Sequence, residues 1–595
     1  MKNTFQFILF FLFSFSVIAQ NTDWQTFYEK SDYKETPRYQ ATIDYCKQLA
    51  SHSPWIKYTI FGESPQGRDL PLLIVDKKGH FDSKSVKVSG NAILLIQACI
   101  HPGEPDGKDA GLMLLRDIAI SKKYEKLLDH VTILFIPIFN VDGHERFGPN
   151  NRINQNGPKE MGWRVTAQNL NLNRDFMKAD APEMQAWLKV FNEWLPDFTV
   201  DCHVTDGADY QYVLTYGLEI YGSMDKNLTD WTRDIYLKKI EKEMDKAHMP
   251  IFPYISFRQW HDPRSGLETG VAPPMLCSGY LSVQNRPGLL IETHMLKDYK
   301  TRVSATYELL KQTAIVLNDD YQNLKKIIST ADEFAASREF RKQPFPLAFD
   351  QTYTDSTMVD FLGVEYTADT SDLSGGLWFK YSNDKPKTFK IPFFDHPQAN
   401  VFANLPEAYV IPPEWTSVIE RLDNHGIKYS RLKEAQTIEV TTYKFLNPKW
   451  NERSYEGRHL LDVNLEEIKT EREYPAGSVV VDMNQRTARV IAHFMEPKAN
   501  DSFVHWGFFD AVFEQKEYGE TYVLETLARQ LLAENPSLKK EFEEKKVKDP
   551  RFAKNSLAIL TWFYSKSPYW DQSLNMYPIG KISDRVIVDK LHIVN

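Results

Sequence analysis

Short apolar runs alternate with longer helical segments along the first half of this chain. Residues 92–100 (AILLIQACI) and 132–139 (TILFIPIF) are almost continuously apolar, as is typical of strands that are covered on both faces. Residues 198–202 and 289–291 are shorter runs of the same kind. Residues 106–120, between the first two runs, carry leucine and alanine at helical spacing. This alternation predicts an α/β layer fold with a mostly parallel or mixed sheet.

The pattern changes past the middle of the sequence. A long helical segment, residues 304–337, closes the first half, and strand-like pieces such as residues 437–443 and 478–482 follow. The chain has 595 residues, which is long for a single domain. We therefore expect a first domain over residues 20–338 and an accessory region of mixed α/β character over residues 339–595, consisting of one or two small domains.

The first twenty residues differ from the rest of the chain. Lys2 precedes an apolar run over residues 5–17, and the small residues Val17 and Ala19 fit a secretory cleavage site. The run is shorter than the ~20 residues of a membrane span. We expect residues 1–19 to be a cleaved signal peptide, with an uncleaved anchor as the alternative. The mature protein is then exported, to the periplasm or outside the cell, without an integral membrane segment.

The balance of charge argues against a nucleic-acid partner. The chain has 71 basic and 80 acidic side chains, a formal net charge of −9 and no long basic run, whereas binding to a phosphate backbone depends on basic patches. Only four cysteines are present, and none has the CxxC spacing of a structural zinc site. Buried free thiols are the preferred interpretation, and one or two disulfides are the alternative.

Polar residues follow the apolar runs directly. His101 and Glu104 lie on a Pro-Gly turn after the first run, and a histidine and a carboxylate three residues apart can direct ligand atoms at one zinc ion. His203 follows the third run and Glu292 follows the fourth. Because open α/β sheets bind their ligands at the carboxyl edge, we expect these side chains to meet there.

The HxxE spacing alone is a weak signal, because the chain repeats it. His493 and Glu496 have the same spacing. This copy lacks the Pro-Gly turn, and we expect it to be a surface or half-buried helix face and not a metal site.

Taken in order, these residues resemble the signature of the zinc carboxypeptidase family, the carboxypeptidase A-like metallopeptidases. The resemblance covers roughly residues 30–330. The matching positions are His101 with Glu104, the Asn-x-Asp-Gly of residues 140–143, Arg164, Asn173 with Arg174, His203 and Glu292. The resemblance implies an exported, bacterial-type member of the family, with a three-layer, mixed-sheet catalytic domain over residues 20–338 and a C-terminal extension.

The resemblance also implies a catalytic metal centre. His101, Glu104 and His203 are the expected ligands of one Zn²⁺ ion, and three protein ligands leave the open position that is typical of a catalytic zinc. Such an ion lowers the pKa of its water to about 7. Glu292 is the expected general base for this water.

The remaining positions are expected to bind the substrate. Arg164 would stabilise the oxyanion of the transition state, and Asn173 and Arg174 would bind the terminal carboxylate, because a guanidinium can form two hydrogen bonds to a carboxylate. Gly270 stands where the family has a mobile tyrosine. Tyr280 is the nearest candidate for that function, and a packing tyrosine is the alternative.

One departure concerns the orientation of the histidines. Asn171 stands where the family has an aspartate that orients a zinc-bound histidine, and an amide oxygen can still accept that hydrogen bond. Asp201 is a possible substitute, because strand alternation places it on the same side as His203.

The leading hypothesis is an exported zinc metallocarboxypeptidase that hydrolyses the C-terminal bond of peptides with a free C-terminus. The first alternative is a zinc amidase or deacylase that acts on cell-wall peptides or acylated amino acids. The second is a non-enzymatic binding protein on a peptidase scaffold. The preferred C-terminal residue and the oligomeric state do not follow from the sequence.

Overall fold

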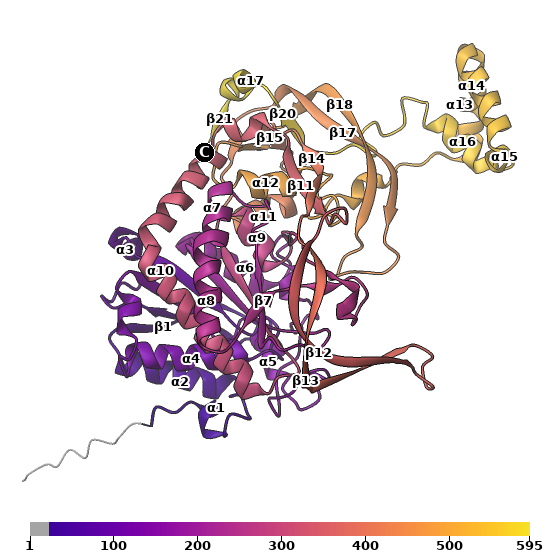
Figure 1. Ribbon diagram of the computed structural model, residues 1–595. Helices are drawn as coiled ribbons and strands as arrows, with labels where there is room; N and C mark the ends of the chain where they lie inside the picture. Colours follow the sequence, from indigo (N-terminus) through magenta and orange to yellow (C-terminus); the bar gives the residue numbers. More distant parts are fainter. Residues whose placement is uncertain (1–22, 595) are drawn as a thin grey trace, which may run out of the picture.

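An eight-stranded mixed sheet occupies the centre of the first half of the protein (Figure 1). The computed structural model describes residues 23–594, so the expected signal peptide lies outside the described residues. The strand order is β1-β2-β4-β3-β5-β10-β6-β7. The strands are β1 (Ile56–Glu63), β2 (Asp69–Val75), β3 (Ala92–Gln97), β4 (Val131–Ile136), β5 (Phe198–Thr205), β6 (Leu214–Leu218), β7 (Ile251–Pro253) and β10 (Gly288–His294).

The four apolar runs of the sequence form neighbouring parallel strands. β3 pairs in parallel with β4 and β5, and β5 pairs in parallel with β10. Every residue of β3, β4 and β5 is buried. This explains why polar and apolar residues do not alternate along the sequences of β3 and β4. β1 and β2 are antiparallel, as are β10 and β6. The prediction of a mixed α/β sheet is therefore confirmed.

Helices cover both faces of this sheet and make three layers. Ile93 and Leu95 of β3 belong to one hydrophobic core. Leu94 and Ile96 point to the other side and belong to a second core. The first core includes residues of α6 (Pro182–Trp194) and α9 (Cys277–Val283), and the second includes residues of α2 (Tyr39–His52), α4 (Asp106–Ala119), α7 (Lys226–Trp231), α8 (Lys238–Lys246) and α10 (Tyr299–Ala335). Shorter helices are α1 (Phe27–Lys30), α3 (Ser83–Ser89) and α5 (Val141–Glu145).

A seven-stranded sheet forms the body of the accessory region. Its order is β18-β17-β20-β15-β19-β16-β21. Its strands are β15 (Ala408–Ile411), β16 (Ser430–Leu432), β17 (Gln436–Trp450), β18 (Leu461–Tyr474), β19 (Val479–Asp482), β20 (Gly580–Ile582) and β21 (Ile593–Val594), and its helices are α11 (Thr416–Asn424), α12 (Ala488–Met495) and α17 (Arg585–Lys590).

The first hydrophobic core extends across both regions. Trp187 and Phe191 of α6 belong to the same core as Val418 of α11 and Phe494 of α12. The accessory region therefore packs on the α6 side of the central sheet and buries apolar side chains that the first region presents.

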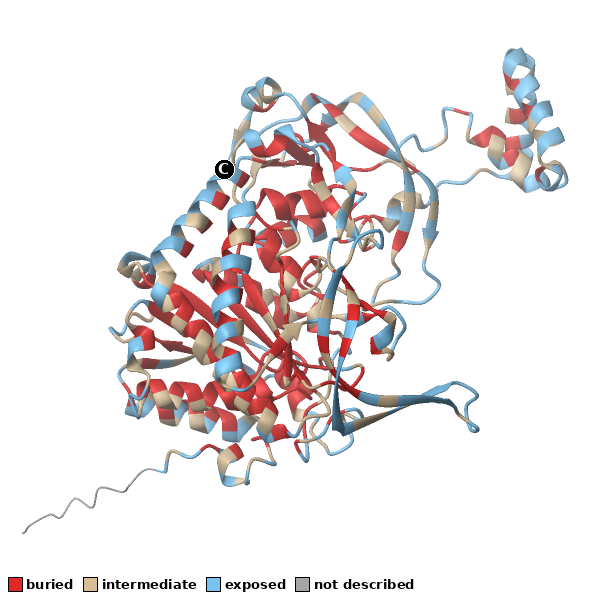
Figure 2. Cartoon of the chain, in the orientation of Figure 1, coloured by how far each residue is buried: buried red, intermediate tan, exposed pale blue. Residues whose placement is uncertain are grey.

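Two parts of the accessory region extend away from this body. β12 (Thr357–Thr370) and β13 (Leu377–Phe394) form a long hairpin, and β13 also pairs with β9 (Leu267–Glu268), which pairs with β8 (Ser256–Phe257). β11 (Phe345–Asp350) pairs with β14 (Gln398–Ala403). Four helices have a small core of their own and lie apart in Figure 1: α13 (Thr521–Glu534), α14 (Pro536–Lys548), α15 (Pro550–Ala553) and α16 (Ser556–Tyr564). Figure 2 shows that both extensions are largely exposed, whereas buried residues gather around the central sheet.

The cysteines are unpaired. Cys46, Cys99, Cys202 and Cys277 are free and buried, as the preferred interpretation of the sequence predicted. Among residues 23–594, no helix combines the length and the apolar character needed to cross a membrane.

Candidate active site

His101, Glu104 and His203, here called the His-Glu-His cluster, lie together at the carboxyl edge of the central sheet. His101 and Glu104 lie on the turn after β3, and His203 belongs to the adjacent strand β5. Cys99 has a φ of 58°, and this left-handed conformation turns the chain at the strand end. Glu104 N donates to His101 O at 2.9 Å and closes the turn. The local fold thus directs both side chains of the HxxE motif to one side.

The ligand atoms of the cluster converge. Glu104 Oε2 lies 3.3 Å from His101 Nδ1 and 3.0 Å from His203 Nδ1, and the two Nδ1 atoms are 3.2 Å apart. All three side chains are buried. Within the part of the chain that the structure describes, this is the one group of three or more His, Cys, Asp or Glu side chains close enough to hold a metal ion together.

Two acceptors fix the histidine rings. His101 Nε2 lies 2.9 Å from Asn171 Oδ1, and His203 Nε2 lies 2.8 Å from Asp201 Oδ2. Because both oxygens accept, each ring carries its proton on Nε2 and directs the lone pair of Nδ1 into the cluster. Burial lowers the pKa of His101 to about 4, which keeps its ring neutral, as metal binding requires. Burial alone would lower the pKa of His203, but Asp201 and Glu104 raise it well above its usual value, so this ring would release a proton when a metal binds. Two imidazoles and one carboxylate are a donor set that suits zinc.

Two arginines hold the Glu104 carboxylate. Arg152 Nη1 lies 2.9 Å and Arg164 Nη1 3.4 Å from Glu104 Oε1. Burial alone would raise the pKa of Glu104, but Arg152 and His101 hold it well below its usual value. Arg152 was not identified from the sequence, because nothing in its polar loop distinguishes it from other surface arginines.

Arg164 reaches the cluster from the surface. Its Nη1 lies 3.3 Å from His101 Nδ1, while its side chain remains 42% exposed. A guanidinium with this placement can contact both the cluster and a group that enters from solvent.

Glu292 lies beside the cluster in the neighbouring strand. In the parallel pairing of β10 with β5, Glu292 is opposite His203. It is buried, and no described residue forms a hydrogen bond with its Oε2. Burial raises the pKa of Glu292 to about 8, with His203 opposing and Glu104 adding to the shift. A buried carboxylate with a raised pKa is suited to accept and return a proton.

Asn173 and Arg174, here called the Asn-Arg pair, lie in the short helix η2 (Leu172–Arg174). Both side chains are half-buried. Asn173 Oδ1 accepts from Cys277 N at 3.1 Å, and Arg174 Nη1 donates to Asn173 O at 2.6 Å. Asn171 Oδ1 also accepts from Asn173 N at 3.0 Å. The same amide oxygen therefore joins the Asn-Arg pair to His101 of the His-Glu-His cluster.

Tyr280 lies elsewhere, which corrects the expectation that it binds the substrate. Its ring is fully buried in the core with Trp187 and Phe176. Its hydroxyl lies 2.8 Å from His425 Nδ1 and accepts from Gln284 Nε2 at 2.7 Å. Tyr280 is a packing residue, because the α9 face that carries it points into the core.

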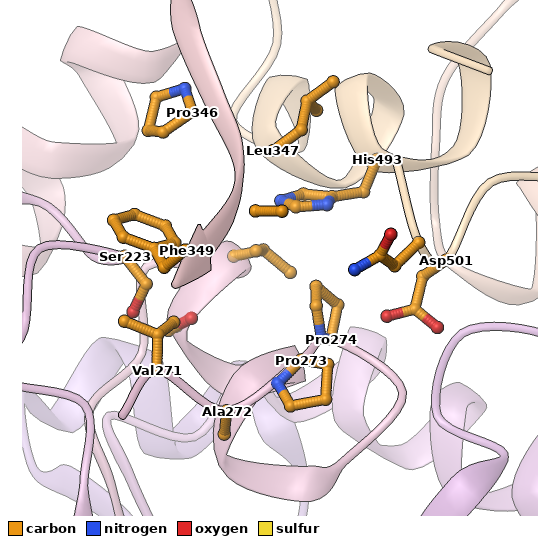
Figure 3. Close-up of a pocket in the computed structure, with 14 residues that line it drawn as sticks. Ser223, Val271, Ala272, Pro273, Pro274, Pro346, Leu347, Phe349, His493 and Asp501 are labelled. Atoms are coloured by element: carbon orange, nitrogen blue, oxygen red, sulfur yellow. The ribbon is translucent and has the colours of Figure 1, made fainter. Parts of the chain in front are cut away.

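The second HxxE motif does not form a metal site. His493 and Glu496 are both buried, His493 in α12 and Glu496 just after it. Figure 3 shows His493 lining a cavity of about 220 Å³ between the two regions. Glu496 is bonded instead to Lys581 Nζ at 2.8 Å and to the Tyr409 hydroxyl. The motif is structural, as expected, although it is buried more deeply than the sequence indicated.

Comparisons with known proteins agree with this site. Residues 42–248 match the family model described as zinc carboxypeptidase. "Carboxypeptidase 2" of Trichophyton equinum is 23% identical over 495 residues, which cover 80% of this chain and 85% of the relative. "Probable carboxypeptidase 2" of Arthroderma benhamiae is 22% identical over 491 residues, which cover 79% and 86%.

Solved structures give weaker matches. The metallo-carboxypeptidase from Burkholderia cenocepacia has a TM-score of 0.35 and 18% identity, over 48% of this chain and 70% of that chain. Carboxypeptidase A from Helicoverpa armigera has a TM-score of 0.37 and 16% identity, over 49% and 75%. The family match and the His-Glu-His cluster agree on zinc as the cofactor. The chain therefore contains a zinc carboxypeptidase domain and is a hydrolase of the metallocarboxypeptidase type.

Proposed function

We propose that the protein removes residues from the C-terminal end of peptides that have a free carboxylate. The observation that carries the proposal is the Asn171 side chain, whose Oδ1 accepts from both His101 Nε2 and Asn173 N. This oxygen ties the metal centre to the Asn-Arg pair, so a terminal carboxylate on the pair holds the preceding peptide bond near the metal. The names of the fungal relatives support the same activity.

Each residue of the site has its own part in the proposed hydrolysis. The His-Glu-His cluster would hold a zinc ion, which would act there as a Lewis acid that polarises a carbonyl and makes water more acidic. Glu292 Oε2 accepts a proton from the attacking water and passes it to the leaving nitrogen. Arg164 Nη1 donates to the carbonyl oxygen as negative charge develops there. Arg174 and the Asn173 amide bind the terminal carboxylate.

A panel of peptide pairs tests the proposal, each pair differing only in a free or an amidated C-terminus. We expect kcat/KM to be at least about 100-fold higher for the free form, since the amide lacks the charge that Arg174 binds. Equal cleavage of both forms would favour the amidase or deacylase alternative. No cleavage by zinc-loaded protein would favour a binding protein.

We also propose that the protein acts after export. The apolar N-terminal run with Val17 and Ala19 supports this location. N-terminal sequencing of protein from the native host checks it, with Gln20 as the expected first residue; an intact Met1 would contradict it.

A further inference from the structure

One turn of the accessory region lies against the Asn-Arg pair. β17 and β18 form a long hairpin (Figure 1) whose connecting segment is residues 451–460. At its tip, Tyr455 N donates to Arg458 O at 2.7 Å, and Arg458 N donates to Tyr455 O at 3.0 Å. Glu456 and Gly457 both have positive φ, 49° and 80°, as in a type I′ turn. Residues 455–458, here called the accessory turn, are therefore a defined hairpin turn.

An ionic pair holds the accessory turn on the first region, and an aromatic contact holds it within the accessory region. Arg458 Nε and Nη2 bind the two carboxylate oxygens of Asp180 at 2.7 and 2.8 Å. Such a two-bond pair fixes both position and orientation. The ring of Tyr455 stacks on Trp506, with 6.2 Å between ring centroids and 19° between the planes. Trp506 also belongs to the accessory region, so the stacking fixes the Tyr455 ring within that region.

The accessory turn contacts two residues that the proposed function depends on. Arg174 Nε donates to the Tyr455 hydroxyl at 3.1 Å, and Asn171 N donates to Glu456 Oε2 at 2.9 Å. Arg174 Nη1 is already bonded to Asn173 O. With Nε and Nη1 both engaged, the guanidinium plane is fixed, and its remaining N–H groups are available for a substrate carboxylate.

We propose that Tyr455 is a positioning residue that acts through Arg174 on the recognition of the terminal carboxylate. The inference rests on the proposed function. It makes the accessory region part of the active site, because the hydroxyl that orients Arg174 comes from a residue 281 positions further along the chain. Binding of the terminal carboxylate then depends on the docking of the accessory turn.

Tyr455→Phe tests the inference, because it removes the hydroxyl and retains the stacked ring. Because the hydroxyl orients the guanidinium and does not itself bind the substrate, we expect KM for free-C-terminal peptides to rise about tenfold, which corresponds to about 1.4 kcal/mol, with kcat changed less than about twofold. Cleavage of the matching amides should not change. Tyr429→Phe is the matched control, since its hydroxyl donates to Asp423 within the accessory region; its kinetics should equal those of the unaltered protein.

A double-mutant cycle with Arg174→Ala shows whether Tyr455 acts through Arg174. In the Arg174→Ala background, Tyr455→Phe should have no further effect on KM. Calorimetry with N-acetylated amino acids and their amides gives a second readout, in which Tyr455→Phe weakens binding of the acids alone. Both measurements use the full-length, zinc-loaded protein.

The outcomes separate the inference from the proposed function. If the unaltered protein cleaves free and amidated peptides equally, the proposed function fails, and the inference fails with it. If the unaltered protein prefers free C-termini and Tyr455→Phe has the same KM values, the inference alone is overturned. An equal loss of activity on both peptide forms also overturns it, because that result indicates a structural function for Tyr455.

Discussion

Asp201 Oδ2 lies 2.8 Å from His203 Nε2, two residues along the same strand. The other histidine of the cluster, His101, is oriented by the amide oxygen of Asn171 instead. The two histidine rings of the cluster therefore have different hydrogen-bond acceptors. A carboxylate raises the basicity of an imidazole ligand more than an amide does, so we expect Asp201 to contribute more to metal affinity than Asn171.

The first prediction concerns this difference. Asp201→Ala should weaken zinc binding about 10- to 100-fold, since it removes the acceptor that fixes the tautomer and orientation of His203. Asp201→Asn retains an acceptor and should lose less. Competition with a chelator of known zinc affinity measures both variants. Unchanged affinity in Asp201→Ala would show that Asp201 does not orient a metal ligand.

A second prediction concerns Arg164. Arg164→Ala should lower kcat about 10²- to 10³-fold with a small change in KM, because the lost hydrogen bond forms mainly in the transition state. Arg146→Ala is the matched control, since that guanidinium lies over the Trp163 ring and has no assigned contact with substrate. Steady-state kinetics on one peptide checks both. A rise in KM alone would assign Arg164 to substrate binding.

A third prediction concerns Glu183, in the first turn of α6. The side chain is fully buried, and neither carboxylate oxygen has a hydrogen-bond partner among residues 23–594. Burial raises the pKa of Glu183 to about 7 from 4.5, so the folded protein retains a proton that the unfolded chain releases. The free energy of unfolding therefore falls between about pH 4.5 and 7 and stays lower above that range.

Glu183→Gln removes this titration. The variant should be more stable than the unaltered protein at pH 8, by up to about 3 kcal/mol, and nearly equal to it at pH 4.5. Urea unfolding of the zinc-free proteins at the two pH values measures the difference. Glu193→Gln, at an exposed position of the same helix, is the control and should show no pH-dependent gain. An equal effect at both pH values would contradict the explanation.

A fourth prediction concerns the boundary between the two regions. A chain that ends at residue 338 would uncover part of the first core, because that core includes residues of α11 and α12. Tyr280 would lose its ring contact and hydrogen bond with His425. Large exposed apolar patches lead to aggregation. We expect the shortened protein to aggregate or to lack a cooperative thermal transition, as measured by size-exclusion chromatography and calorimetry. A monodisperse, cooperatively melting product would show that residues 20–338 fold independently.

The sequence predicted the parts of the site that lie next to strands. His101, Glu104, His203 and Glu292 each follow or end a largely apolar run, and the strand pairing brings these ends to one edge. The order of these residues along the chain was therefore sufficient to place them together. The resemblance to the zinc carboxypeptidases pointed to Asn171, and strand alternation pointed to Asp201, as acceptors for the histidines.

Contacts between distant segments could not be predicted in this way. Tyr455 and Glu456 reach the Asn-Arg segment across more than 280 residues, and no local pattern indicates such docking. Tyr280 was assigned incorrectly because spacing along the chain does not show which face of α9 points into the core. The contribution of the accessory region to the site follows from the tertiary structure alone.

The measurement that tests the central claim most directly is made on Glu292→Gln, with zinc content and turnover determined on the same preparation. The account predicts one zinc ion per chain in both proteins, since Glu292 is not a ligand, and a kcat at least about 100-fold lower in the variant, since the amide cannot accept the proton. Full turnover in zinc-loaded Glu292→Gln would contradict the account, because the proton would then be moved by another group.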